Sequence, residues 1–81
     1  MYKIYNPVTN NYAKGGIDDL WTKHGKIWPT INNLKLHLSV VKSYPYTNRY
    51  QKYITHGCMV INVLTDEEFP IKLLIDNPEN F

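Results

Sequence analysis

The sequence predicts an α+β fold in which two antiparallel β-hairpins form one sheet with one central amphipathic helix, all within a single domain over residues 1–81. Three observations predict it. Short runs rich in β-branched and aromatic residues, separated by turn residues, lie near both ends of the chain. One stretch in the middle carries apolar residues at helical spacing. Because the strands and the helix occur in separate blocks, the pattern is typical of an α+β domain rather than of alternating α/β architecture.

The first hairpin is predicted at the N-terminus. Residues 2–5 alternate aromatic with basic and apolar residues, as a half-buried strand does. Residues 6–9, NPVT, place a proline at the second position of a type I turn. Asn10 can adopt the left-handed conformation that closes such a turn. Residues 11–14 then return as the second strand.

The segment between this hairpin and the helix is short and mixed in character. Residues 15–16 are two glycines, interpreted as a flexible turn because the aspartates that follow them would repel a phosphate. Residues 17–25 are predicted to form a loop that can include one helical turn at residues 18–22. Residues 26–28 are predicted to be extended, because the residue before Pro29 is disfavoured in the helical region.

The helix is predicted to begin at Thr30, whose hydroxyl can accept a hydrogen bond from the backbone N–H of Asn32 or Asn33. A second apolar pair, Leu36 and Val40, falls on the side nearly opposite the main apolar stripe. A helix buried on one face has no use for such a pair, so it either packs under the C-terminal strands or contacts a partner such as a second copy. The stripe predicted to face the core is Ile31, Leu34, Leu38 and Val41.

Residues 44–57 are rich in tyrosine and basic groups, with weak periodicity. A helix, a strand and a loop therefore all remain open for this segment. Tyr46, Tyr50 and Tyr53 would share one face of a helix, whereas Pro45 favours a break before any helix.

The second hairpin is predicted in the C-terminal part. Residues 58–64, CMVINVL, read as a strand buried on at least one face. Residues 65–68 turn the chain, and residues 69–75 are predicted to return as the partner strand, with Pro70 at an edge position. Residues 76–81 carry no packing signal and are predicted to fray.

Cys58 is the single cysteine, so no internal disulfide can form, and it is interpreted as a small core hydrophobe. The N-terminus lacks the apolar stretch of a signal peptide, and no segment approaches the roughly 20 apolar residues of a membrane span. These features predict a reducing, cytoplasmic location.

Charge is divided unevenly along the chain. Residues 1–57 hold eight of the nine Lys and Arg residues against two aspartates, a local balance of +6, and residues 58–81 have a balance of −4. The histidines and tyrosines also all fall in the first part. A division of this kind favours association of the first part with polyanions.

Metal and catalytic sites are weakly indicated. His24, His37 and His56 are 13 and 19 residues apart, with no cysteine or carboxylate at ligand spacing, so we expect neither a metal nor another cofactor. A metal-independent nuclease would need two histidines as acid and base beside a cation. The residue types are present, but nothing in the sequence shows that they converge, and we expect no catalytic residues.

Single-stranded RNA is the polyanion that the residue types fit best. Cations can follow its phosphates, and aromatic rings can stack on its bases. Trp21 and Trp28 stand among the basic residues, but in so small a domain they are favoured as core anchors, and whether they are core or exposed is left open. The candidate RNA-binding residues are Lys14, Lys23, His24, Lys26, Lys35, His37, Lys42, Arg49 and Lys52.

Three stretches, YKIYNPVTNNYAKGG, GKIW and LKLHL, match a pattern of the form YxIYNxxTxxYxKGG, W(S/T)KxGKxW and LKxHL. In these stretches the chain resembles the TifA family of small tailed-phage accessory proteins, which inhibit the ToxN endoribonuclease of a toxin–antitoxin system. The match covers about residues 2–38, and the C-terminal half agrees only in being a β-hairpin with acidic residues. His24 stands at a variable position of this pattern where another lysine is expected, and this weakens the expected RNA contact. The residues carried over by the motifs are Lys14, Lys23, Lys26, Lys35 and His37.

The resemblance implies a homodimer that binds RNA, engages the endoribonuclease toxin together with RNA in an infected bacterial cell, and suppresses RNA cleavage without being an enzyme. An alternative is a protein-interaction module that uses Leu36, Val40 and the acidic hairpin and needs no nucleic acid. A third, a small nuclease, would be excluded if RNA stays intact with the purified protein.

Overall fold

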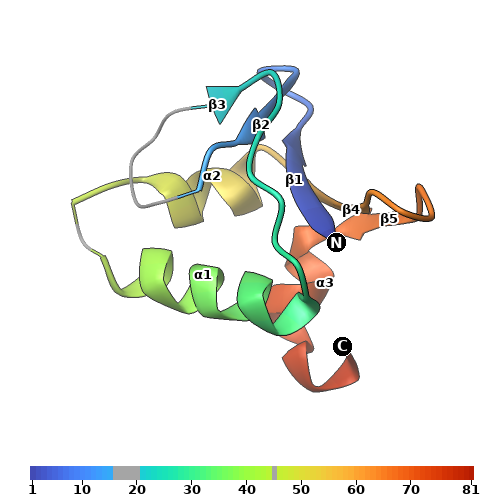
Figure 1. Cartoon of the computed structure of the whole chain (residues 1–81). Coiled ribbons are helices and arrows are strands. Elements are labelled where there is room, and N and C mark those ends of the chain that lie inside the picture. The colour runs from blue at the N-terminus through green and yellow to red at the C-terminus, as the bar shows by residue number, and fades with distance from the viewer. Residues whose placement is uncertain (16–20, 45) are drawn as a thin grey trace.

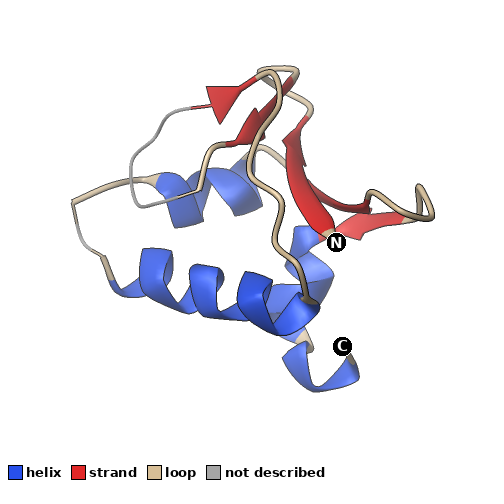
Figure 2. Cartoon of the chain, in the orientation of Figure 1, coloured by secondary structure: helices blue, strands red, loops and turns tan. Residues whose placement is uncertain are grey.

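The computed structural model describes residues 1–15, 21–44 and 46–81 of the chain. Its strands are β1 (Tyr2–Asn6), β2 (Asn11–Ala13), β3 (Trp21–Thr22), β4 (Met59–Asn62) and β5 (Glu68–Pro70), and its helices are α1 (Ile31–Ser43), α2 (Arg49–Thr55), α3 (Ile71–Asp76) and the 3-10 helix η1 (Pro78–Asn80). The strands described form one antiparallel sheet in the order β3-β2-β1-β4-β5. Helices α1, α2 and α3 lie together on one side of this sheet (Figure 1, Figure 2). The predicted α+β fold class is confirmed.

The first hairpin forms as predicted. β1 and β2 pair with Tyr5 opposite Tyr12, and Asn10 adopts a positive φ of 57° at the end of the turn. Asn6 closes the turn from inside: its carbonyl oxygen accepts from Asn10 N at 2.8 Å, and its side-chain Oδ1 accepts from Val8 N at 2.9 Å. The Asn6 side chain is fully buried, so the turn is anchored to the interior of the protein.

The segment before α1 differs in part from the prediction. Trp21 and Thr22 form β3 and pair with β2, which contradicts a helical turn at these two residues, and the rest of that expected turn lies outside the described residues. Trp28 is extended as predicted and bridges Tyr2, with the two N–H···O bonds between them both 2.8 Å long. The chain therefore lies beside β1 before it enters the helix.

Helix α1 confirms the predicted start and the predicted core stripe. Asn33 N donates to Thr30 Oγ1 at 3.2 Å, which is the expected N-cap. Leu36 and Val40 remain 65% and 52% exposed, so the C-terminal strands do not cover them. The stripe is buried at Leu34, Leu38 and Val41 and half-buried at Ile31.

Within the open segment at residues 44–57 the structure has a helix, α2, and the described residues 46–48 before it are irregular; Pro45, where a break was predicted, lies outside the described residues. α2 begins after Asn48, and it presents Tyr53 to the core while Tyr50 is half-buried. Tyr46 precedes the helix and is exposed, so only two of the three tyrosines share the predicted face.

The second hairpin is shorter than predicted. β4 pairs with β5, but residues 71–76 form α3 instead of continuing the strand predicted over residues 69–75. Pro70 has no N–H with which to extend the ladder, and it occupies the N-cap position of α3. Ile71 and Leu74, three residues apart, are then both buried. The β-branched residues of this stretch favoured a strand, and burial of a helical stripe outweighed that preference.

Residues 76–81 make contacts with the rest of the protein, although residues 76 and 78–81 are exposed, and the predicted fraying stays a prediction. Asp76 ends α3, a single turn of 3-10 helix follows, and the Phe81 ring stacks on Phe69 with 4.7 Å between ring centroids. Lys35 Nζ also donates to the Phe81 carbonyl oxygen at 2.6 Å. The aromatic contact supplies the packing signal that this polar tail otherwise lacks.

The core lies between the sheet and the helices, and Cys58 sits within it as predicted. Burial raises the pKa of its thiol to about 12, so the thiol is neutral at physiological pH. None of the helices described is long and apolar enough to span a membrane. The buried apolar residues are Ile4, Ala13, Trp28, Leu34, Leu38, Val41, Tyr53, Cys58, Val60, Ile71 and Leu74.

Candidate nucleic-acid interface

The side of the sheet opposite the helices carries aromatic and basic side chains. Ile4 faces the core and is fully buried, so its neighbours Lys3 and Tyr5 point to the other side, because successive side chains of a strand alternate. The register places Tyr12 beside Tyr5, with ring centroids 5.3 Å apart and planes at 59°. Lys3 Nζ lies 5.1 Å from the centroid of the Tyr12 ring. A cation and two aromatic faces thus lie together on this outer side.

A tight turn between Thr22 and Gly25 packs against Tyr12 and carries further basic residues. Gly25 N donates to Thr22 Oγ1 at 2.7 Å, and Gly25 has a positive φ of 69°. A Cβ atom at this glycine would lie only 2.4 Å from Cβ of Tyr12, so the turn packs directly on that tyrosine and only glycine fits. Lys23 and His24, within the turn, are both exposed. Both residues therefore lie next to a glycine that packs on Tyr12.

Lys14 and Lys26 complete this group. Lys26 N donates to the carbonyl oxygen of Ala13 at 2.9 Å, next to Lys14 in the chain. The Lys26 side chain lies across Gly15, where an added Cβ would come within 2.5 Å of its Cδ. Both lysines are exposed. Lys26 lies at the border of this surface with the helical side, because its Nζ is 5.9 Å from the centroid of the Trp28 ring and it lines a groove with residues of α1. We call the whole group, with Lys26 at its border, the basic-aromatic surface: Lys3, Tyr5, Tyr12, Lys14, Lys23, His24 and Lys26.

The sequence reasoning missed three members of this surface, Lys3, Tyr5 and Tyr12. Their signal is the strand period of two, which places Lys3 and Tyr5 on one side of β1 and Tyr12 and Lys14 on one side of their strand. The period does not reveal which side the helices cover. The side that the helices cover decides whether these residues lie in the core or on the surface.

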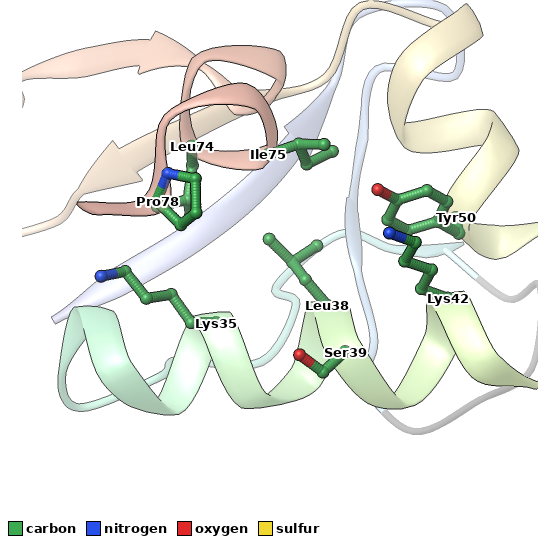
Figure 3. A pocket seen from close by; sticks show the side chains of 8 residues that line it. All are labelled: Lys35, Leu38, Ser39, Lys42, Tyr50, Leu74, Ile75 and Pro78. Atoms are coloured by element: carbon green, nitrogen blue, oxygen red, sulfur yellow. The ribbon is translucent and has the colours of Figure 1, made fainter. Parts of the chain in front are cut away.

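Three predicted lysines lie elsewhere, on the helices. Lys35 and Lys42 of α1 stand at the two ends of a slot between helices (Figure 3), and Lys52 is half-buried on α2. Because the helices cover the opposite side of the sheet, these residues do not join the basic-aromatic surface. The predicted cations therefore form more than one group.

Arg49 requires a correction, because it is buried and 0% exposed. Its guanidinium carbon lies 4.5 Å from the centroid of the Trp21 ring and 5.8 Å from that of Tyr53. A side chain enclosed in this way stabilises the packing of α2 against β3 and cannot reach the phosphates of a bound RNA. Its spacing of four from Tyr53 on a helix placed both on the core face.

His37 is also unsuited to bind phosphate by charge. Its Nε2 lies 2.7 Å from the Tyr53 hydroxyl oxygen, and its ring is 4.7 Å from that of Trp28. Burial, and then the positive charges of Arg49 and Lys26, lower the pKa of His37 to about 4. The imidazole is therefore neutral at physiological pH and belongs to the packing around the two tryptophans.

The tryptophans themselves act as core anchors. Trp28 is buried, and Trp21 is half-buried with its ring 5.9 Å from Tyr53 in an edge-to-face arrangement. Lys26 Nζ lies 5.9 Å from the centroid of the Trp28 ring. As favoured from the sequence, the tryptophans hold the basic segment in place and offer little surface for stacking.

Each histidine has different surroundings. His24 is exposed in the turn, His37 meets Tyr53, and His56 Nδ1 lies 2.9 Å from Nδ2 of the buried Asn6. Within the part of the chain that the structure describes, no group of three potential metal ligands occurs.

A groove of about 320 Å³ adjoins the basic-aromatic surface at Lys26. The exposed pair Leu36 and Val40 forms one of its walls, and His37 and Trp28 lie in its depth. The residues predicted to contact a protein partner thus lie next to the predicted RNA contacts. The lining residues are Lys26, Trp28, Pro29, Asn33, Leu36, His37 and Val40.

No protein-family model matches the chain, and no curated protein or solved structure shows significant similarity to it. The function must therefore be argued from the geometry of these surfaces together with the motif resemblance.

Proposed function

We propose that the protein is a non-enzymatic RNA-binding protein that holds single-stranded RNA on the basic-aromatic surface. The observation that carries this proposal is the contact of Lys3 with the Tyr12 ring beside Tyr5. Single-stranded RNA is bound by cations that follow its phosphates and by aromatic faces on which bases stack. This surface supplies both.

The order of strands gives the bound strand a preferred side. β3, β2 and β1 carry or adjoin the cations, whereas Glu68 of β5 lies across Ile61 from Lys3 on the same outer side. A carboxylate at that edge repels phosphate, so the RNA backbone is confined to the β1-to-β3 half.

The biological role that we propose follows the resemblance to the TifA family. The protein acts as a phage counter-defence factor in the cytoplasm of an infected bacterium, where it binds RNA together with a ToxN-like endoribonuclease and prevents cleavage. Its likeness in the YxIYNxxTxxYxKGG stretch covers Tyr5, Tyr12 and Lys14 of the proposed surface. A homodimer would double the number of phosphates neutralised and so steepen the dependence of binding on salt.

A second candidate is a protein-interaction module that uses the groove beside Leu36 and Val40. The observation that favours it is the 65% and 52% exposure of this apolar pair on α1. A large exposed apolar pair beside a groove is a feature of surfaces that bind other proteins.

The experiment is a salt titration of binding to a fluorescent single-stranded RNA, measured by anisotropy. We expect a log–log slope of about −0.7 per neutralised phosphate, and K14E, K23E and K26E should each weaken binding and make the slope shallower. K72E is the matched control, because Lys72 pairs with Asp76 on α3 at 3.6 Å, away from the sheet. Binding that is undetectable or insensitive to salt contradicts the proposal.

The same variants separate the two candidates in an assay of toxin inhibition. Under the RNA-binding proposal, the triple variant K14E/K23E/K26E no longer protects RNA from a ToxN-like enzyme. Retained protection by this variant, with loss in L36D/V40D, would favour the protein-interaction module. RNA degraded by the purified protein alone would instead indicate a nuclease.

A further inference from the structure

A slot of about 200 Å³ opens between α1, α2 and α3, on the helical side of the molecule (Figure 3). Leu38 and Leu74, both buried, form its floor with the half-buried Ile75. Lys35 and Lys42 stand at its two ends with Leu38 between them. They are seven residues apart on one helix, which separates their Cα atoms by about 10.5 Å along the axis. The slot is thus apolar inside and positive at both ends.

The positive ends retain hydrogen-bonding and pairing capacity. Lys35 Nζ donates to the carbonyl oxygen of Phe81, which uses one of its three donors. Lys42 Nζ lies 5.9 Å from the centroid of the Tyr50 ring. The nearby Asp76 is paired with Lys72, and among the described residues no Asp or Glu side chain forms an ion pair with either slot lysine.

The tip of the β4–β5 hairpin has the complementary character. Leu64 is 73% exposed there, although it is a large apolar residue, and the carboxylates that follow it are exposed as well. In Figure 1 this tip, coloured orange, projects from the edge of the molecule. We call it the acidic tip: Leu64, Thr65, Asp66, Glu67 and Glu68.

Hydrogen bonds hold the acidic tip in one shape. Leu64 N donates to Asn62 Oδ1 at 3.0 Å, Asp66 N donates to the Asn62 carbonyl oxygen at 2.8 Å, and Glu67 N donates to Thr65 Oγ1 at 3.3 Å. Asp66 adopts a positive φ of 61°. A segment already held in its bound shape loses little conformational freedom on binding.

We propose that the slot binds the acidic tip of a second copy of this chain. Leu64 of one copy enters the apolar floor, and the Asp66 and Glu67 carboxylates reach the Lys35 and Lys42 ammonium groups of the other. The division of charge along the sequence, +6 over residues 1–57 and −4 over residues 58–81, favours this pairing of unlike surfaces.

The contact joins two different surfaces of the chain. Made reciprocally about a two-fold axis, two such contacts close a dimer; made in one direction, they leave a free tip on one copy and a free slot on the other, and assembly continues into a chain or closes as a ring. This interface is distinct from the α1 pair Leu36 and Val40, and it leaves the basic-aromatic surface open on every copy. It does not depend on RNA.

The first test is sedimentation velocity of ribonuclease-treated protein over a range of concentrations at low and high salt. We expect association that grows with concentration and weakens with salt, and L64S should shift it to roughly tenfold higher concentration. L73S is the matched control, because Leu73 is exposed on α3 and does not line the slot. Circular dichroism of each variant verifies that it is folded.

A charge swap makes the test decisive. K35E/K42E and D66K/E67K should each be monomeric alone, because slot and tip then carry the same sign. Mixed together they should associate with each other, since the acidic tip of the first variant fits the basic slot of the second and the basic tip of the second fits the acidic slot of the first. A wild-type protein that stays monomeric overturns the proposal, as does association unaffected by L64S or a failure of the two charge variants to bind each other. Association that responds only to L36D would belong to the α1 pair and would overturn it too.

Discussion

The two hairpins of the sheet close with the same local chemistry and carry opposite charge. In the first, NPVTN, Asn6 accepts from the N–H of Val8 and from that of Asn10. In the second, NVLTD, Asn62 does the same for the residues two and four further on. Both turns end in a residue with positive φ, 57° in the first and 61° in the second. The shared pattern shows that these turns are local structures, independent of the charges around them.

What differs is the surroundings. Asn6 is buried and its amide meets His56 behind the sheet, whereas Asn62 is half-buried at a projecting tip. The first hairpin carries Lys3 and Tyr12 on its outer side, and the second carries Asp66 and its acidic neighbours. The same turn geometry thus occurs in the anchored first hairpin, which carries basic residues, and at the exposed acidic tip of the second.

The largest expected difference between the hairpins is in stability. Asn6→Ala removes a buried hydrogen-bonding group and should lower the free energy of unfolding by roughly 2 to 3 kcal/mol, whereas Asn62→Ala at the exposed tip should cost about 1 kcal/mol. Urea denaturation followed by circular dichroism measures both. Equal losses would mean that the surroundings of the two turns do not matter to stability.

The second largest expected effect is on the affinity of the first hairpin for RNA. Tyr12→Leu keeps an apolar side chain against Gly25 but removes the ring, and it should weaken binding of single-stranded RNA roughly tenfold, about the contribution of one stacked base. Tyr46→Leu is the control, since Tyr46 is exposed outside the basic-aromatic surface. Anisotropy titrations at one fixed salt concentration compare the variants. A loss of similar size in both would argue against stacking on Tyr12.

Acid should destabilise the region behind the first hairpin. The pKa of His37 is lowered from 6.5 to about 4, so between these values the unfolded chain binds the proton more readily than the folded one. Stability should therefore fall as pH decreases through this window and level off below it. His37→Gln should flatten that part of the profile, measured as urea midpoints from pH 7 to pH 4. A variant with the wild-type slope would show that other groups cause the acid sensitivity.

The smallest effect is expected at the ends of the two turns. Asn10→Gly and Asp66→Gly each place glycine where φ is positive, and relief of backbone strain offsets the greater freedom of the unfolded chain, so each should change stability by less than about 1 kcal/mol. Thermal unfolding measures the pair. A large loss at Asn10 alone would point to its hydrogen bond with the Tyr5 hydroxyl.

Local interactions were predictable because they are encoded within a few residues. The turn at Asn10, the N-cap at Thr30 and the stripe through Leu34 and Leu38 each follow from neighbours in the chain, and all are confirmed. The prediction of a strand over residues 69–75 is wrong, because the structure of this stretch depends on contacts with distant segments. Its β-branched residues fit either state locally, and the buried side of α3 exists only because the sheet and the other helices are there to cover it.

The candidate site also has some features that the sequence indicated and others that only the structure decides. Residue types and charge division in the sequence already indicated a basic surface, and Lys14, Lys23, His24 and Lys26 do gather at one edge of the sheet. Arg49 and His37 look like further cations in the sequence. The structure encloses one among aromatic rings and leaves the other neutral, because burial penalises a charged imidazole.

By itself, then, the sequence determined the fold class, the first hairpin, the start and core face of α1, and which half of the chain is basic. Those properties depend on backbone preferences, side-chain period and composition. Only the tertiary structure decided which side of the sheet the helices cover, and with it whether Lys3, Tyr5 and Tyr12 are surface or core. It also placed Lys35 and Lys42 around an apolar slot and left Leu64 exposed, because distant segments must pack together before a slot or a projecting tip exists.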